Sequence, residues 1–279
     1  MVAGIGEISG LRPLKPIRRA LISRESIRKL LKTRLSEAVS AEQIRHEELF
    51  LKKFGFVEEQ FNLAEQLVEV LAEQAAALYD FKTKTLYLAT WSPDELQEPA
   101  LAHELVHVLE DQHFNLDKFS KKAKGADQDL ARSAVVEGQA SWVMIEYVLR
   151  QSGRSLMETP LLAAAAAGSS RFEAERYPVY SASPLYLRET LLFPYTEGLL
   201  FHQAVIEKYG REGFARVFRR PPISSQQILL PEAYFERRKP TRPALPTIKL
   251  PRCFKKTSQG EIGQLDHFIL LKQHVGEEQ

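Results

Sequence analysis

Apolar residues recur every three or four positions through most of the chain, and this spacing predicts amphipathic helices. In the first third, three such segments each follow a polar residue that can cap a helix N-terminus. We expect these helices over residues 23–39, 40–55 and 62–75. Gln43 and Glu65 lie three positions beyond the capping residues of the second and third helices, as in a capping box. Their apolar stripes are expected to pack into the core.

The helical spacing is missing from two other stretches of this region. Residues 1–22 are expected to be an irregular or extended lead-in that ends in an extended segment at 17–22. Apolar and polar residues alternate instead around 77–79 and 85–88, which predicts two strands joined by a polar loop. The sequence therefore predicts one hairpin among helices.

The segment that follows the hairpin predicts a buried helix. It carries His103-Glu104-Leu105-Val106-His107 within a run of apolar and helix-compatible residues. We expect Pro99 in the first turn of this helix, because a proline in the interior would remove a backbone hydrogen bond. Residues 92–95 have the form of a capping box and are expected to form a separate short turn before it.

The remainder of the chain is predicted to be mainly helical. One helix is expected to begin near residues 127–129 and to end near Gly153. Later helices are expected at 185–192, 196–209, 212–219 and 266–275, with a capped turn at Ser225. The predicted fold class is α+β and predominantly helical, in one domain over residues 1–279. We expect two lobes, 1–153 and 154–279, the second of them helical.

Composition is that of a globular protein with one large core or two smaller ones. The 279 residues are 44% hydrophobic, and no run of 18 apolar residues predicts a transmembrane segment. Cys253 is the single cysteine, which excludes intrachain disulfides. The first ten residues lack the features of a secretory signal, so a cytoplasmic location is the default expectation, with export if a longer precursor exists.

Charge is nearly balanced, at +2, but it is unevenly distributed. Residues 236–256 hold eight basic residues and one acidic residue, which would suit nucleic acid or anionic lipid. Four prolines in the same stretch favour an extended, solvated connection, and no aromatic platform accompanies the charge. We therefore expect no nucleic-acid partner.

His103 and His107 are four residues apart, so a helix carries both imidazoles on the same face within reach of one metal ion. Glu104, beside the first histidine, can take a proton from a water molecule without being a ligand. A structural histidine pair is the alternative interpretation. We favour the metal site, because ionisable groups on an apolar helix are costly to bury without a bound partner.

A catalytic zinc site needs a third protein ligand, and Glu137 is the candidate. Small residues share its helix face, so another helix could approach closely there, while the neighbouring apolar residues leave little polar surface. A solvated surface glutamate is the alternative. His113 lies on a different face of the first helix and is interpreted as a helix-end or supporting residue.

HExxH followed by a glutamate on a later helix resembles the gluzincin metallopeptidases. The chain is also similar to a poorly characterised bacterial set of HExxH proteins over residues 101–116, 135–140, 193–201 and 221–234. The resemblance implies a zincin-like fold, zinc bound by His103, His107 and Glu137, and Glu104 as general base. It also implies that the strand before the HExxH helix holds an extended substrate by adding it to the sheet.

Two positions depart from the pattern that the resemblance implies. Leu230 stands where relatives carry a histidine, and Ser141 stands where thermolysin-like enzymes carry an aspartate. The orientation of His107 must then depend on another acceptor, either Asp111 or a backbone carbonyl.

The predicted activity is hydrolysis of a peptide bond in a peptide or protein substrate by a zinc-activated water, with Glu104 moving the proton. Tyr195 is the candidate donor to the oxyanion, with His202 and Tyr147 behind it. A tyrosine packed in the core with its hydroxyl satisfied is the alternative interpretation of such a residue. The alternative function is an inactive zinc-binding interaction protein on the same fold.

Overall fold

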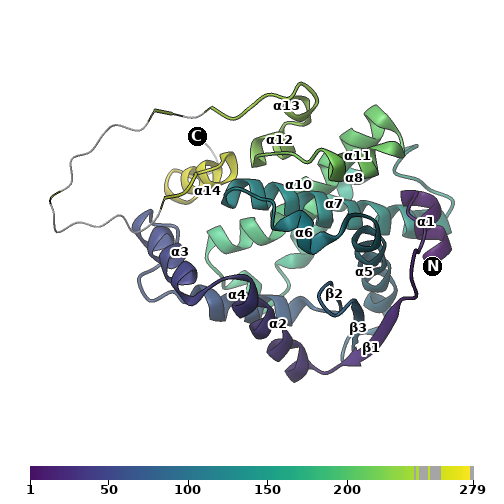
Figure 1. Cartoon of the computed structure of the whole chain (residues 1–279), viewed down its shortest axis with the longest axis horizontal. Coiled ribbons are helices and arrows are strands. Elements are labelled where there is room, and N and C mark those ends of the chain that lie inside the picture. The colour runs from purple at the N-terminus through teal and green to yellow at the C-terminus, as the bar shows by residue number, and fades with distance from the viewer. Residues whose placement is uncertain (242, 245–250, 252–258, 277–279) are drawn as a thin grey trace.

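Two long helices, α7 (Ala126–Gln151) and α10 (Leu185–Tyr209), pack against each other through the middle of the computed structural model (Figure 1). The structure describes residues 1–241, 243–244, 251 and 259–276. The α7–α10 contact is the most extensive one between any two described elements. It brings the second and third quarters of the chain together in one core.

The closest approach of these two helices is at a pair of glycines. A methyl group at Gly138 of α7 would lie 2.3 Å from the backbone carbon of Gly198 of α10. A methyl group at Gly198 would lie 2.5 Å from the carbonyl oxygen of Ala134. Only hydrogen side chains allow the backbones to come this near. Glu137 and Tyr195 lie close to these glycines in sequence, so the crossing sets where both are placed.

The small sheet has the strand order β1-β3-β2. β2 (Ala77–Asp80) and β3 (Thr85–Ala89) form an antiparallel hairpin, which confirms the predicted hairpin. β1 (Arg18–Ile22) pairs with β3 in parallel, so the predicted extended segment is confirmed and joins the sheet. The sheet lies at the lower edge of the molecule in Figure 1.

Helices make up most of the rest of the described chain. The helix that carries His103 and His107 is α5 (Asp94–Phe114). The helices before it are α1 (Val2–Ser9), α2 (Arg24–Ala38), α3 (Ala41–Lys53) and α4 (Leu63–Gln74). The helices after α5, besides α7 and α10, are α6 (Leu116–Ser120), α8 (Leu161–Ala174), α9 (Pro178–Ser181), α11 (Glu212–Arg219), α12 (Ser225–Leu229), α13 (Pro231–Phe235) and α14 (Gln264–His274). The structure is thus α+β and predominantly helical, as predicted.

The predicted starts of the N-terminal helices are confirmed by their caps. The Ser23 side chain accepts a hydrogen bond from the Ser26 N–H at the start of α2. Ser40 and Gln43 form the predicted capping box of α3, and Asn62 accepts from the Glu65 N–H at the start of α4. The predicted helices at 212–219 and 266–275 are also present, as α11 and α14.

The first helix corrects the prediction of an irregular lead-in over 1–22. Ile5 and Ile8 of α1 are buried, and α1 packs against α5 and α7 (Figure 1). Gly10 ends the helix with a φ of 75°. Burial of these apolar side chains outweighs the weak intrinsic helix preference of a segment with two glycines.

Two prolines lie inside continuous helices, although the sequence predicted a helix boundary near each of them. α5 is continuous from Asp94, with Pro99 in its interior, so the separate turn at 92–95 was wrong. α10 likewise runs through Pro194, so the predicted break between 192 and 196 was wrong. An interior proline costs about 3 kcal/mol. Both helices pack extensively on α7, and that packing offsets the cost.

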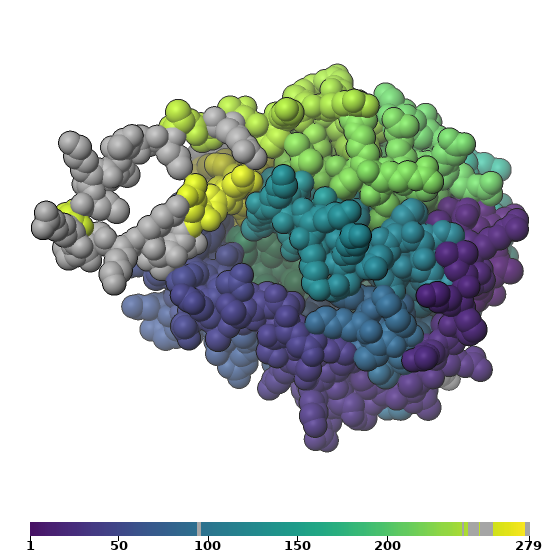
Figure 2. Space-filling model, viewed as in Figure 1, coloured from purple at the N-terminus to yellow at the C-terminus, as the bar shows by residue number. Residues whose placement is uncertain are grey.

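The C-terminal helix packs on the core and also contacts the chain just after α3. α14 packs against α10 and α12, and the Gln273 side chain donates to the Gly55 carbonyl oxygen at 2.6 Å. In Figure 2 this helix, in yellow, lies beside teal residues from the middle of the chain. Most of the basic stretch at 236–256, with Cys253, lies outside the described residues.

The predicted lack of a transmembrane segment agrees with the described helices. None of them combines the length and apolar character that crossing a bilayer requires.

The glycine crossing leads to a stability prediction. Gly138→Ala is expected to lower the free energy of unfolding by about 1–3 kcal/mol or more, because its methyl group would overlap the α10 backbone. Gly168→Ala on α8 is the matched control, since nothing lies within 4 Å of its methyl position. It should raise stability by up to about 1 kcal/mol through helix propensity. Urea denaturation measures both, and equal effects of the two substitutions would contradict the close crossing.

Candidate metal centre

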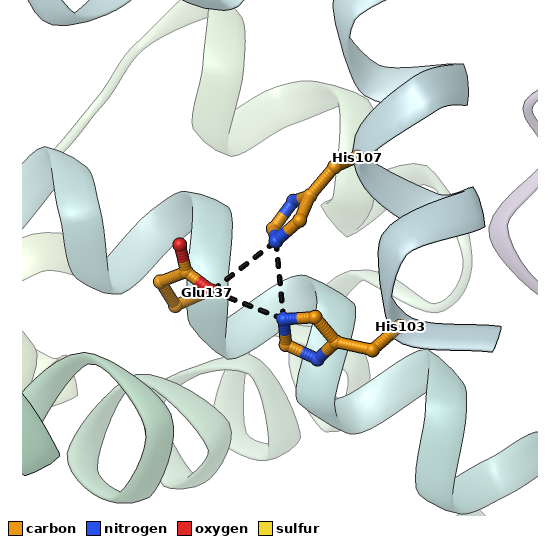
Figure 3. Close-up of side chains that lie close together, drawn as sticks. All are labelled: His103, His107 and Glu137. Carbon is orange, nitrogen blue, oxygen red and sulfur yellow. Dashed lines mark hydrogen bonds and ion pairs between the residues drawn. The ribbon is translucent and has the colours of Figure 1, made fainter. Parts of the chain in front are cut away.

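The structure brings His103, His107 and Glu137 together, as the sequence predicted (Figure 3). α5 supplies both imidazoles from adjacent turns, and α7 supplies the carboxylate from the facing helix. The Nε2 atoms of the two histidines are 3.1 Å apart. Oε2 of Glu137 lies 3.1 Å from the first and 3.2 Å from the second. The three atoms thus form a nearly equilateral triangle.

A metal ion could lie among the three atoms of this triangle. His107 has its Nδ1 atom 3.0 Å from the buried Glu110 carboxylate, so its proton belongs on Nδ1 and its lone pair on Nε2. A proton on Nε2 of His103 can point to only one of the other two atoms. With both histidines neutral, the edge between His107 and Glu137 or the edge between the two histidines would then hold two facing lone pairs, unless a second proton occupies Nε2 of His107. A metal ion satisfies all three atoms at once.

The size of the triangle fits a tetrahedral metal site. Ligand atoms held at 2.0–2.1 Å from a tetrahedral ion lie roughly 3.3 Å from one another. The observed separations of 3.1–3.2 Å are slightly shorter and need only a small opening. Among the described residues, no fourth histidine, cysteine or carboxylate belongs to this group. Three protein ligands with a free fourth position is the arrangement of catalytic zinc sites.

The charges of the cluster favour a bound cation. Burial alone would lower the pKa of His107, but the Glu137 carboxylate and the hydrogen bond that His107 donates to Glu110 raise it well above its ordinary value. Burial would raise the pKa of Glu137, yet His107 and His103 hold it well below its usual range. The site therefore keeps its carboxylate ionised and attracts positive charge, whether a proton or a metal ion.

Glu110 is a site residue that the sequence prediction missed. It is fully buried, three residues after His107, and its Oε2 atom accepts from the His107 Nδ1–H. Its other oxygen, Oε1, has no hydrogen-bond partner among the described residues. Burial raises the pKa of Glu110, while its bond to His107 lowers it. A carboxylate that fixes the tautomer and orientation of a ligand histidine is the usual supporting residue of a metal site.

Asp111 does not orient His107, so that prediction was wrong. Its side chain accepts from the Tyr79 hydroxyl at 2.8 Å, from Lys84 Nζ at 2.7 Å and from the Leu116 N–H at 3.0 Å. These bonds attach the β2–β3 hairpin to α5. Successive residues project about 100° apart on a helix, so Glu110 faces the histidine and Asp111 faces the sheet.

Glu104 lies beside the candidate metal-binding group, which consists of His103, His107 and Glu137, without belonging to it. Its Oε2 atom accepts a hydrogen bond of 2.6 Å from the backbone N–H of Tyr79 in β2. The carboxylate is also near enough to the cluster to raise the pKa values of His107 and Tyr195. The side chain thus lies between the metal-binding group and the outer strand of the hairpin.

Tyr195 reaches the site from α10. Its ring stacks on His103 with centroids 5.8 Å apart, and 38% of the residue is exposed. Desolvation, followed by the Glu137 and Glu104 carboxylates, raises the pKa of its hydroxyl well above the ordinary value. A hydroxyl in this setting stays protonated and can act as a hydrogen-bond donor.

Three other candidate residues lie away from the metal-binding group. His202 is fully buried, and its Nε2 atom donates to the Val135 carbonyl oxygen at 2.9 Å. Tyr147 packs against Gly4 of α1. His113 is exposed near the end of α5, where it bonds to the Arg12 carbonyl oxygen at 2.8 Å, so its helix-end role is confirmed.

Leu230 and Ser141, the two positions that depart from the expected pattern, both lie outside the candidate metal site. Leu230 is 43% exposed between α12 and α13, and Ser141 is buried in α7 one turn beyond Glu137. Neither is in the metal-binding group.

No family model matches this chain, and neither a curated protein nor a solved structure matches it.

The role of Glu110 leads to a prediction about metal affinity. Glu110→Gln keeps the size of the side chain but removes its charge, and should lower zinc affinity about 10- to 100-fold. Competition with a chromogenic chelator measures this. Asp111→Asn is the matched control, because it lies on the same helix but contacts the hairpin. It should affect stability and leave zinc affinity within about twofold; the reverse pattern would show that Asp111 supports the site.

Burial of His202 predicts a pH dependence of stability. Burial lowers the pKa of His202 from 6.5 to about 4, so as pH falls the unfolded chain binds this proton before the folded chain does. The resulting stability is complete above pH 6.5 and is lost progressively down to pH 4, by about 3 kcal/mol. Urea denaturation from pH 7 to pH 4 should therefore show a shallower decline for His202→Gln than for the wild type. Parallel declines would contradict a neutral, buried His202.

Proposed function

We propose that this chain is a zinc-dependent peptidase with a zincin-like site. The observation that carries the proposal is the convergence of two Nε2 atoms and one carboxylate oxygen within 3.2 Å, with Glu104 beside them. Imidazole and carboxylate ligands suit zinc, and three of them leave one position for water or substrate. Bound there, zinc would act as a Lewis acid and make a water molecule acidic near pH 7.

Glu104 is the proposed general base. Its carboxylate would accept a proton from the attacking water and later deliver it to the departing amine. The hydrogen bond from the Tyr79 N–H to Oε2 supports this role, because it fixes the carboxylate beside the metal-binding group. A structural metal site has no need of such a base.

An extended peptide is the proposed substrate, held on the outer edge of β2. Ala89 N–H bonds to Ala76 O, so by alternation the backbone groups of Ala77 and Tyr79 point away from β3. The Tyr79 N–H already donates to Glu104. The N–H and carbonyl of Ala77 and the carbonyl of Tyr79 are therefore the backbone groups that an added strand could bond. An added strand at this edge would place its backbone next to the general base.

Tyr195 is the proposed donor to the oxyanion. Its protonated hydroxyl, near the Glu137 carboxylate, would hydrogen-bond the negative oxygen that forms when the scissile carbonyl is attacked. The partial exposure of Tyr195 and of Glu137, whose side chain is 25% exposed, supports access of a substrate from solvent.

An inactive zinc-binding interaction protein is the second candidate. The observation that favours it is the 2.6 Å bond between Glu104 and the Tyr79 N–H, which also gives this carboxylate a structural role in joining α5 to the sheet. The three-residue ligand group favours the peptidase, since a closed site would contain a fourth ligand among the described residues.

Substitution of Glu104 tests the proposal. Wild-type protein loaded with zinc should cleave a mixed peptide library. Glu104→Gln should retain one zinc per chain and lose activity by at least about 100-fold, since the amide can still accept from Tyr79 but cannot take a proton. Mass spectrometry of the library and metal analysis measure the two properties.

Glu98→Gln is the matched control, because Glu98 lies on the same helix and its carboxylate accepts a hydrogen bond from the exposed Gln151 side chain. It should leave both zinc content and cleavage unchanged. Zinc binding by all variants with cleavage by none would support the inactive binding protein. Cleavage that survives Glu104→Gln would contradict the proposed general base.

A further inference from the structure

A hollow in the C-terminal part of the molecule is lined mainly by arginines. It has a volume of about 570 Å³ and lies between the end of α10, α11 and the residues after α13. The lining residues that matter here are Tyr209, Glu212, Arg216, Arg219, Arg220 and Arg237. Four arginines and one glutamate therefore line the same hollow.

These arginines are not neutralised by carboxylates of the protein. Among the described residues, none of the four forms an ion pair. Elsewhere in the described chain, arginines such as Arg34 and Arg171 each contact two acidic side chains. A surface that gathers unpaired cations around a hollow attracts anions.

The hollow is also preorganised. Arg216 lies over the Tyr209 ring at 4.3 Å from its centroid, and Arg220 lies over the Tyr234 ring at 5.9 Å. The Tyr234 hydroxyl donates to the Arg220 carbonyl oxygen at 2.8 Å. Arg237 has a φ of 60° and its N–H bonds to the Tyr234 carbonyl oxygen. Stacking and backbone bonds limit the freedom that these side chains would lose on binding.

We propose that this hollow binds a compact polyanion of the phosphorylated small-molecule class. Arginine guanidinium groups bind phosphate oxygens in pairs, and several of them around one hollow suit a ligand with several negative charges close together. The volume lies in the range of about 300–1,000 Å³ that is usual for small-molecule sites. This site is new and independent of the proposed peptidase activity.

The hollow is separate from the metal centre. Tyr209 lies 14 residues beyond Tyr195 on the same helix, α10, which corresponds to a distance of roughly 21 Å along its axis. In Figure 1, α11 and α13 lie in the upper part of the molecule, on the opposite side from the sheet. A ligand in the hollow would therefore contact none of the proposed metal ligands.

A small ligand fits these observations better than a nucleic acid. Single-stranded nucleic acid is held by a basic track with free aromatic faces on which bases stack. Here Arg216 and Arg220 cover the rings of Tyr209 and Tyr234, and the four arginines surround one hollow. The arginines thus surround one hollow and do not form an extended basic track.

Calorimetric titration with sodium tripolyphosphate tests the proposal. The double substitution Arg219→Gln with Arg237→Gln should weaken binding at least about tenfold, because both side chains are exposed and neither stacks on a ring in the structure. Arg45→Gln with Arg176→Gln is the matched control, since it removes two exposed charges elsewhere. It should leave affinity nearly unchanged. All three proteins share the metal centre, so chelation of zinc by the ligand affects them equally.

Two further probes distinguish the ligand class. Citrate should bind more weakly than tripolyphosphate, and citrate that binds as tightly would overturn the choice of phosphate chemistry. A 20-nucleotide single strand should be displaced from the protein by tripolyphosphate or fail to bind. A strand that binds tightly and is not displaced, equal losses in both double variants, or no heat with tripolyphosphate would each overturn the proposal.

Discussion

The meeting of two imidazoles and one carboxylate between two helices is central to this structure. His103, His107 and Glu137 hold their facing nitrogen and oxygen atoms 3.1–3.2 Å apart, an arrangement that a positive charge stabilises, whether a proton on a histidine or a bound metal ion. The histidines come from α5 and the carboxylate from α7, so the arrangement requires these two helices to be held in place by packing around the site.

That packing is supplied by α7, which contacts both α5 and α10. The glycine crossing with α10 sets the distance between those two backbones. Beyond it, the buried Trp142 ring of α7 donates to the Gln203 side chain of α10 at 2.8 Å. On the other side, Glu110 fixes the His107 ring and Asp111 attaches the hairpin to α5. Each element of the site is thus supported by a contact outside it.

Sequence reasoning predicted what depends on local periodicity and missed what depends on long-range packing. Spacing along one helix was enough to place the histidine pair, and the small and apolar residues around Glu137 were enough to indicate the glutamate of α7. It offered Asp111 or a backbone carbonyl as the partner of His107 and missed Glu110, since the partner depends on where α7 and the sheet lie around α5. The continuity of helices through Pro99 and Pro194 likewise reflects tertiary contacts that outweigh a local penalty. The buried α1 has the same explanation.

Anomalous diffraction at the zinc edge from crystals of the zinc-loaded protein would show whether these three residues bind a metal ion. We predict one strong anomalous peak, bonded to Nε2 of His103, Nε2 of His107 and a carboxylate oxygen of Glu137 at roughly 2.0–2.2 Å. A fourth, non-protein ligand should complete a tetrahedron. No peak at these residues in crystals that contain zinc, or a peak with a fourth protein ligand, would contradict an open catalytic metal site.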